Sequence, residues 1–151
     1  MSLDVRIATP HDFDGLMTLV RLAHADNGQH AFSETKIRES IAAACRMEKA
    51  IIGVIGPVGD LRAAIHMIIN EIYYSDDVQL FELWTFVRED SRRSDFAKKL
   101  LQFAKDCAEQ AKLDLLIGII SDQRLEEKER LYKRTFQKAG TFFVHHGAQA
   151  A

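Results

Sequence analysis

The stretch that decides the fold runs from residue 83 to residue 97 and reads Leu83-Trp-Thr-Phe-Val87, then Arg-Glu-Asp-Ser, then Arg92-Arg-Ser-Asp-Phe-Ala97. An apolar run typical of a strand leads into a polar loop, after which apolar residues recur at helical spacing. Basic residues gather where this helix begins: Arg92, Arg93, Lys98 and Lys99. A helix dipole disfavours each cation there by a few tenths to about 1 kcal/mol, yet backbone N–H groups at a helix start bind anions, and arginine strengthens such a site. The stretch therefore predicts either an anion site in a strand–loop–helix unit or a solvated basic patch.

Outward from this stretch, hydrophobic periodicity divides the chain into strands and helices. Strands are expected at residues 3–8, 50–55, 61–73, 78–87, 115–120 and 141–145, and helices at 10–26, 34–47, 94–112 and 123–139. The order is β-α-α-β-β-β-α-β-α-β, with a hairpin in the first half and a β-α-β crossover in the second. The predicted fold class is α/β, with one mixed sheet whose wholly apolar strand 115–120 is central and covered on both faces.

Composition sets the broad class of protein. The chain has 151 residues, of which 47% are apolar and 28% charged, with only 2 prolines, and this excludes disordered and fibrous chains. We expect a single domain over residues 1–151, with an ordered core at 3–145 and a frayed tail at 147–151. The net charge of −2 gives no drive toward nucleic acid or an anionic membrane, so neither is an expected partner.

The ends and the cysteines indicate the compartment. Asp4 and Arg6 interrupt any apolar N-terminal region, and no apolar run approaches the roughly 20 residues of a membrane span. Cys45 and Cys107 fall at apolar helix positions, as reduced core thiols do. The sequence thus favours a cytoplasmic protein. No His or Cys spacing is typical of a metal site, so no metal is expected.

Two segments resemble a known family. Val87, Arg92 and Ala97 match the spacing of the acyl-CoA-binding motif V-x-x-x-x-[QR]-x-x-G-x-[GA] of the GCN5-related N-acetyltransferases, with Asp95 at the glycine position. The run 130–134, Arg-Leu-Tyr-Lys-Arg, is similar to the L-Y-x-[KR] helix of that family. The element order also matches, so the resemblance covers roughly residues 3–145. It implies transfer of an acetyl group from acetyl-CoA to a primary amine by direct attack.

The resemblance also implies roles for individual residues. The strand residues Thr85, Phe86 and Val87 would line the pantetheine arm of CoA. The loop and first helical turn would hold its pyrophosphate, and the matched positions are Arg92, Arg93, Ser94, Asp95, Phe96 and Ala97. Tyr132 matches the tyrosine that protonates the leaving thiolate, although a tyrosine on a helix face is by itself more typical of packing.

A carboxylate completes the candidate chemistry. By strand alternation Glu82 shares a face with Trp84, where burial would raise its pKa and make it a base for the acceptor amine. The alternative is an edge carboxylate that faces water. The acceptor itself is not identified, and the segment from Asn27 to Met47 would shape its side of the site.

Other interpretations remain open from the sequence. A non-catalytic CoA-binding or interaction module on the same scaffold would explain Asp95 as a mark of a decayed loop. An anion- or RNA-binding domain would use the basic residues 92–99. Residues 126–130 read as a solvated helix face, His66 as a core or cleft histidine, and strand 141–145 as an edge that can pair across a homodimer.

Overall fold

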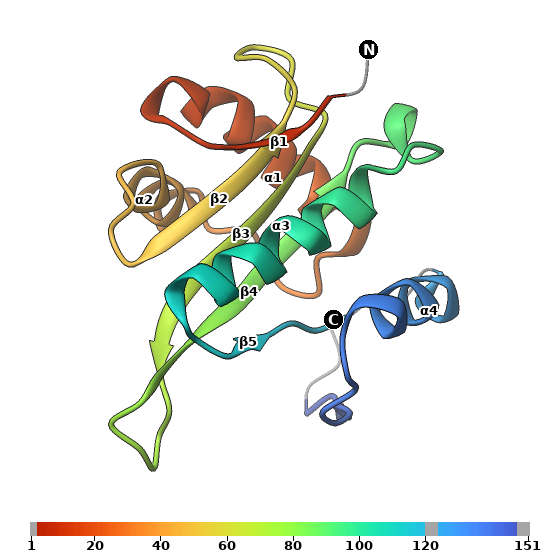
Figure 1. The fold of residues 1–151 in the computed structure, drawn as a ribbon. Helices are drawn as coiled ribbons and strands as arrows, with labels where there is room; N and C mark the ends of the chain where they lie inside the picture. The colour runs from red at the N-terminus through yellow and green to blue at the C-terminus, as the bar shows by residue number, and fades with distance from the viewer. Residues whose placement is uncertain (1–2, 120–123, 148–151) are drawn as a thin grey trace.

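A five-stranded mixed sheet forms the centre of the protein (Figure 1). The computed structural model describes residues 3–119 and 124–147. The strands are β1 (Val5–Ile7), β2 (Ala50–Ile55), β3 (Ala63–Glu71), β4 (Val78–Val87) and β5 (Leu115–Leu116), and they lie side by side in this order. Neighbouring strands are antiparallel from β1 to β4, whereas β4 and β5 are parallel. The predicted hairpin and crossover are therefore confirmed.

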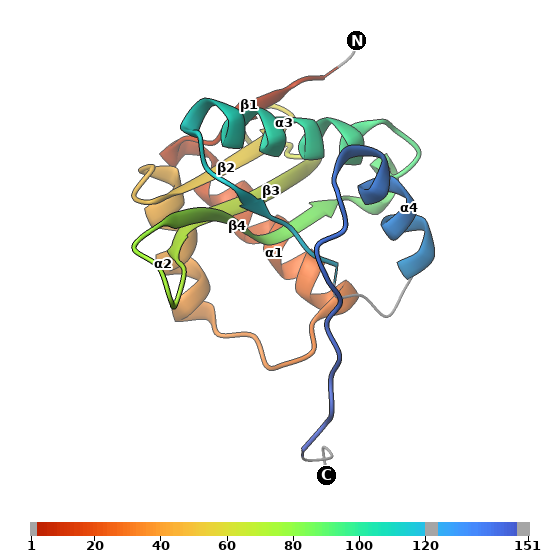
Figure 2. The same ribbon diagram turned by 60° about the horizontal axis from the view of Figure 1, so that its bottom comes forward.

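Four helices cover the two faces of this sheet. They are α1 (Phe13–Asn27), α2 (Glu34–Cys45), α3 (Phe96–Ala111) and α4 (Leu125–Thr135), and single 3-10 turns stand at Pro10–Asp12 and Glu89–Ser91. Helices α1 and α2 lie on one face and α3 on the other, as Figure 2 shows, while α4 contacts α3 beside the end of β4. The crossover helix α3 thus ends up opposite the first two helices, and each face of the sheet has its own core.

Trp84 and Phe86 pack with the core on the α1–α2 side, whereas Leu80 and Val87 belong to the core under α3. Apolar residues of both parities along β2 and β3 are buried, because both faces of the sheet are covered.

Hydrogen bonds to capping residues, which the sequence predicts, mark the starts of the turn before α1 and of α2. The Asp12 carboxylate accepts a hydrogen bond from the Thr9 N–H at 2.9 Å, and Pro10 occupies the first position of the turn, where no N–H is needed. The Ser33 hydroxyl accepts the Lys36 N–H at 3.3 Å and caps α2. These two caps confirm the predicted helix starts and hold α1 and α2 on their face of the sheet.

The C-terminal strand predicted at 141–145 is wrong. Residues 137–146 form no strand or helix, and Phe142, Phe143 and Val144 are 75%, 94% and 77% exposed. Helix α4 ends at Thr135 instead of residue 139, and the chain then runs away from the sheet (Figure 2). Strand-forming composition is not enough here, because a strand needs the backbone of a neighbour to pair with.

The prediction of a long central strand at 115–120 is also wrong, because residues 141–145 do not pair beside it. Strand β5 spans only Leu115–Leu116 and forms the edge of the sheet, so it is neither long nor central. The end of the predicted strand at residue 120 and the start of the predicted helix at residue 123 lie outside the described residues. So does the expected tail, apart from Gly147. In the part of the chain that is described, no helix is long and apolar enough to cross a membrane.

Candidate active site

An irregularity in β4 creates the site. His66 of β3 lies opposite Trp84, but the next residue, Met67, lies opposite Glu82, so Leu83 is an extra residue in β4. Such a β-bulge reverses the alternation of the strand. The prediction that Glu82 shares a face with Trp84 is therefore wrong. Glu82 points with Leu80 toward α3, while Trp84 and Phe86 point toward α1 and α2.

Immediately beyond this bulge, β4 loses its neighbour on one side. The pairing of β4 with β5 ends at Phe81 and Leu116, and the following residues of the two strands are not paired with each other. The Gly118 N–H donates a hydrogen bond to the Glu82 carboxylate at 3.2 Å, so a side chain bridges the two segments where the backbone ladder has stopped. The backbone of β4 past Phe81 is left open to another molecule on this side.

A cavity of about 820 Å³ occupies this opening, and we call it the central cavity. It passes from the α1–α2 side of the sheet to the start of α3 and the inner face of α4. Most of the predicted site residues line it: Glu82, Thr85, Phe86, Val87, Arg92, Ser94, Ala97 and Tyr132. Arg93, Asp95 and Phe96, all within the described chain, do not.

Three polar side chains meet inside the central cavity. Thr85 donates its hydroxyl hydrogen to Glu82, and the Tyr132 hydroxyl faces the two, since both shift its pKa. Glu82 is only 8% exposed. Because β4 supplies Glu82 and Thr85 while α4 supplies Tyr132, the cluster joins two elements about fifty residues apart in the sequence. The structure thus brings together the two residues that the sequence suggested for proton transfer.

Burial controls the protonation of this cluster. It raises the pKa of the Glu82 carboxyl, although hydrogen bonds from Thr85, the Gly118 N–H and Tyr132 oppose the rise. Burial, together with the nearby charge of Glu82, also raises the pKa of the Tyr132 hydroxyl above its ordinary value. Tyr132 therefore keeps its proton at neutral pH and can act as a hydrogen donor.

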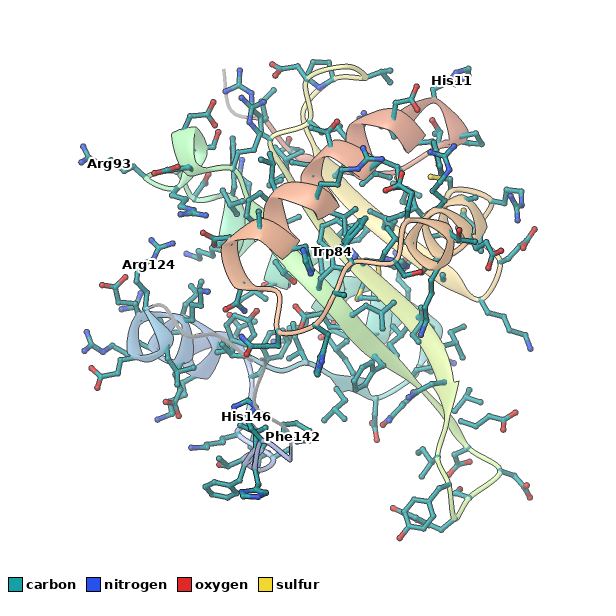
Figure 3. The ribbon with its side chains drawn as sticks, turned by 180° about the vertical axis from the view of Figure 1, so that it is seen from behind. His11, Trp84, Arg93, Arg124, Phe142 and His146 are labelled. Carbon is teal, nitrogen blue, oxygen red and sulfur yellow. The ribbon has the colours of Figure 1, made fainter. Side chains whose placement is uncertain are left out.

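The loop after β4 is held by its own charged residues. Arg92 pairs with Asp26 of α1 at 3.2 Å, donates to the Val87 carbonyl at 3.3 Å and lies 5.8 Å from the centre of the Phe86 ring. Ser94 accepts the Phe96 N–H at 3.2 Å next to the start of α3, two residues later than the sequence predicted. Arg93 is exposed and points away from the protein (Figure 3).

Asp95, at the position of the motif glycine, does not obstruct this loop. Its φ of −89° suits any residue, so the backbone here needs no glycine. The carboxylate is 63% exposed and lies 3.8 Å from Lys99, one helical turn further on. The side chain therefore points away from the central cavity, and the loop keeps a usable shape without glycine.

The α1–α2 side of the central cavity is aromatic. Trp84 lines it and donates its indole N–H to His66 at 3.1 Å, and Figure 3 shows Trp84 between the sheet and α1. Burial lowers the pKa of His66 to about 4, so this core histidine is neutral and can accept that hydrogen. His24 and Phe32 face each other across the α1–α2 connection with ring centres 5.1 Å apart. The expected acceptor segment from Asn27 onward thus reaches the cavity through Asn27, Gly28, Phe32 and Ile37.

Two basic residues that the sequence analysis did not single out also line the central cavity. Arg124 precedes α4, and Lys128 lies one helical turn before Tyr132 on the same face of α4. The predicted solvated face at 126–130 is therefore wrong for Lys128, which is half-buried. The spacing of four residues between Lys128 and Tyr132 was the one signal that could have revealed it.

No group of three or more His, Cys, Asp or Glu side chains in the described part of the chain is arranged as metal ligands. The polar groups that line the central cavity include hydroxyl, carboxyl, imidazole and cationic side chains.

Comparisons with known proteins identify the fold. No family model and no curated protein matches the sequence. Among solved structures, a possible acetyltransferase from Clostridium difficile 630 is similar with a TM-score of 0.74 and 11% identity over 99% of this chain and 100% of that one. AAC(6')-Iy in complex with the bisubstrate analog CoA-S-monomethyl-acetylneamine gives 0.75 and 8%, over 99% and 100%. A predicted acetyltransferase with acetyl-CoA from Clostridium acetobutylicum gives 0.75 and 12%, over 96% of each chain. The protein therefore has the fold of the GCN5-related N-acetyltransferases.

Proposed function

We propose that the protein is an N-acetyltransferase that moves an acetyl group from acetyl-CoA to a primary amine by direct attack. The proposal rests above all on the buried contact of Tyr132 with Glu82 in the central cavity. A proton donor and a carboxyl group together are what an exchange of protons between an amine and a thiolate requires. The fold supports the proposal, because solved structures that share it are described as acetyltransferases.

The residues of the central cavity fit CoA. Past Phe81 the β4 backbone is unpaired with β5 and can bond the amides of an extended pantetheine arm. Thr85, Phe86 and Val87 line that stretch, and Arg92, Ser94 and Ala97 line the cavity where α3 begins. Arginine and the N–H groups of a helix start suit a diphosphate. Contacts of Arg93, Asp95 and Phe96 with CoA stay a prediction. Their side chains do not line the cavity, so such contacts require their backbone or a different side-chain position.

The chain's own residues supply the proton transfers. Acetyl-CoA, when bound, supplies a thioester whose carbonyl carbon the amine attacks directly. We assign to Tyr132 the donation of its hydroxyl proton to the departing sulfur. We assign to Glu82 the uptake of the proton that the amine gives up, and its return to Tyr132. One proton thus leaves nitrogen and one reaches sulfur, and the raised pKa of Glu82 brings this carboxyl closer to the amine in basicity.

Replacing Tyr132 by Phe tests the assignment. The ring keeps its packing but loses the proton, so we expect kcat to fall about 10²–10⁴-fold while the KM for acetyl-CoA changes little. Release of free thiol with neamine and with a peptide bearing a free N-terminal amine measures the rate. Acetyl-CoA should raise the melting temperature of wild type and variant alike.

A matched control is Tyr74→Phe, because Tyr74 lies on the β3–β4 turn and is 77% exposed. It should leave both kinetic constants unchanged. No thermal shift with acetyl-CoA would contradict the proposal altogether. A shift without turnover of any amine, unaffected by Tyr132→Phe, would instead support the non-catalytic CoA-binding module.

The acceptor is proposed only as a primary amine on a small molecule or peptide. The similarity to a structure solved with a CoA–neamine bisubstrate analog supports an amine as the acceptor. The homodimer through residues 141–145 and the cytoplasmic location stay predictions.

A further inference from the structure

The α1–α2 side of the central cavity is left over when CoA is fitted to the rest. The proposed CoA site uses the open edge of β4 and the start of α3, where Arg92 and Ser94 line the cavity. The remaining lining comes largely from α1, α2 and the segment between them, and Figure 3 shows Trp84 next to α1 on this side. An acceptor bound beside CoA would therefore contact this lining.

Apolar side chains supply most of the lining on this side. The residues that provide them are Val20, Ala23, Phe32, Ile37, Trp84 and Phe86, and we call them the apolar wall. Phe32, Trp84 and Phe86 are half-buried and pack against the core between the sheet and the two helices. The core thus holds the rings of the apolar wall in place.

The polar atoms of the neighbouring rings are already engaged. The Trp84 indole N–H donates to the buried His66 at 3.1 Å, so the indole offers the cavity its ring and no donor. The Nε2 atom of His24 lies 2.6 Å from the His30 carbonyl oxygen, and the His24 ring meets Phe32 edge to face. These rings therefore meet a ligand with apolar surface more than with hydrogen-bonding groups.

Carboxylates for a multiply charged acceptor are missing on this side. Among the described lining residues, those from positions 13–45 include one carboxylate, that of Asp26, and it pairs with Arg92 at 3.2 Å. Over the whole described lining, the carboxyl groups of Asp26, Glu82 and Glu127 are matched by three Arg and Lys side chains. A second ammonium group on the acceptor would therefore leave water without a counter-charge, which is unfavourable.

We propose that the acceptor is a primary monoamine with an apolar aromatic body, an arylalkylamine, whose ring lies against Trp84 and Phe32. This inference rests on the proposed function and narrows its acceptor. Burial of the ring gains from the apolar area removed from water, and aromatic pairs add to that gain in edge-to-face or offset arrangements. Glu82 and Trp84 line the same cavity two positions apart on β4, so a short chain between ring and amine can reach the carboxyl group.

The first test compares three acceptors at saturating acetyl-CoA: 2-phenylethylamine, ethylamine, which lacks the ring, and neamine, which carries several amino groups. We expect kcat/KM for 2-phenylethylamine to exceed the values for the other two by about tenfold or more, since ring burial is the main gain. Release of free thiol measures all three rates. An equal or higher kcat/KM for neamine or ethylamine would overturn the inference.

The second test removes one ring of the apolar wall. Phe32→Ala should raise the KM for 2-phenylethylamine about tenfold and leave the KM values for ethylamine and acetyl-CoA unchanged. Phe32→Tyr keeps the ring and should retain most of the wild-type efficiency. The matched control is Phe13→Ala, because Phe13 packs against the same core but does not line the cavity. It should leave all three KM values unchanged even where it lowers the melting temperature.

Phe32→Glu adds an unpaired carboxylate to this side, so it should raise kcat/KM for neamine and lower it for 2-phenylethylamine. Equal effects of Phe32→Ala on 2-phenylethylamine and ethylamine would overturn the inference and leave the proposed function standing, because Phe32 would then not bind the ring of the acceptor. Absence of turnover with all three amines would also overturn the inference. The thermal shift with acetyl-CoA then decides whether the proposed function fails with it.

Discussion

Asp12 shows how one buried charge ties three segments together. Its carboxylate is 1% exposed and accepts two hydrogen bonds from Arg6, each at 2.8 Å, and one from the Thr9 N–H. The same guanidinium donates to the Gly56 carbonyl at 3.0 Å in the turn after β2. The pair therefore connects β1, the start of α1 and the β2–β3 turn. Removing one partner of such a pair costs far more than the pair contributes net, because a charge is left buried.

Asp12→Asn should lower the free energy of unfolding by about 2 kcal/mol at pH 7. Hydrogen bonds from Arg6 hold the pKa of Asp12 below its ordinary value of 3.8, so the stabilisation is complete above that value and is lost as the pH falls through the lowered pKa. Urea unfolding should show the full difference between wild type and variant at pH 7 and pH 5, and a shrinking difference below about pH 4.

Asp14→Asn is the control at the residue scale, since Asp14 is an exposed residue of α1. It should change the stability little at any of these pH values. A difference for Asp12→Asn that persists undiminished at low pH would mean that the side chain acts through packing alone.

The sequence analysis was least accurate for the orientation and burial of single side chains. Tyr132 could be singled out because the run 130–134 resembles a helix of a known family, and Glu82 because burial on its strand would raise the pKa of its carboxyl. The face of Glu82 could not be predicted, because simple alternation cannot reveal the extra residue Leu83. Lys128 was missed for another reason: in a helix rich in charge, only the tertiary structure shows which charge is half-buried.

At the scale of elements, α3 packs closely against the sheet at a glycine of β2. A Cβ atom on Gly53 of β2 would lie 2.5 Å from the Phe103 ring of α3 and 2.9 Å from Val5 of β1. The missing side chain thus allows the close approach of helix and sheet. Because α3 begins at the proposed diphosphate site, this contact also sets where that site stands.

Gly53→Ala should lower the free energy of unfolding by about 1–3 kcal/mol, because the Phe103 ring must move. The overlap with the ring disappears when Phe103 is shortened and only the contact with Val5 remains, so Gly53→Ala should cost less in a Phe103→Ala background. Urea unfolding of the four proteins of this cycle measures the coupling. Additive effects of the two changes would show that another contact positions α3.

Elements with strong local signals were predictable. Strands β2 and β4 have the predicted bounds, and the Thr9–Pro10 and Ser33 caps mark helix starts. The elements in the last third of the chain could not be predicted, because they depend on pairing with segments distant in the sequence. Residues 141–145 have the composition of a strand, yet β5, the edge strand next to β4, is only two residues long and offers little backbone to pair with.

At the scale of the whole molecule, β5 is one of two edge strands in the described sheet, and the strand-forming segment 141–145 pairs with neither. β5 has β4 as its one neighbour among the described strands, and Phe143 is 94% exposed. An exposed edge and an apolar extended segment favour pairing with another chain. The predicted homodimer would satisfy both at once.

Phe143→Pro tests this pairing, because proline removes the N–H that a ladder needs. We expect wild type to form a dimer at micromolar concentration in sedimentation velocity, and the proline variant to dissociate at least tenfold more readily. Phe143→Ala, which keeps the N–H, should weaken the dimer less. A wild-type protein that stays monomeric at all concentrations would disprove the homodimer.

The extra residue at Leu83 has a consequence for how this chain can change over generations. Deleting it would restore plain alternation with Glu82 and Trp84 still on opposite faces, because these two residues would then follow one another directly. A gene that lost this codon would therefore still encode both walls of the cavity, and only the local bend of β4 would disappear.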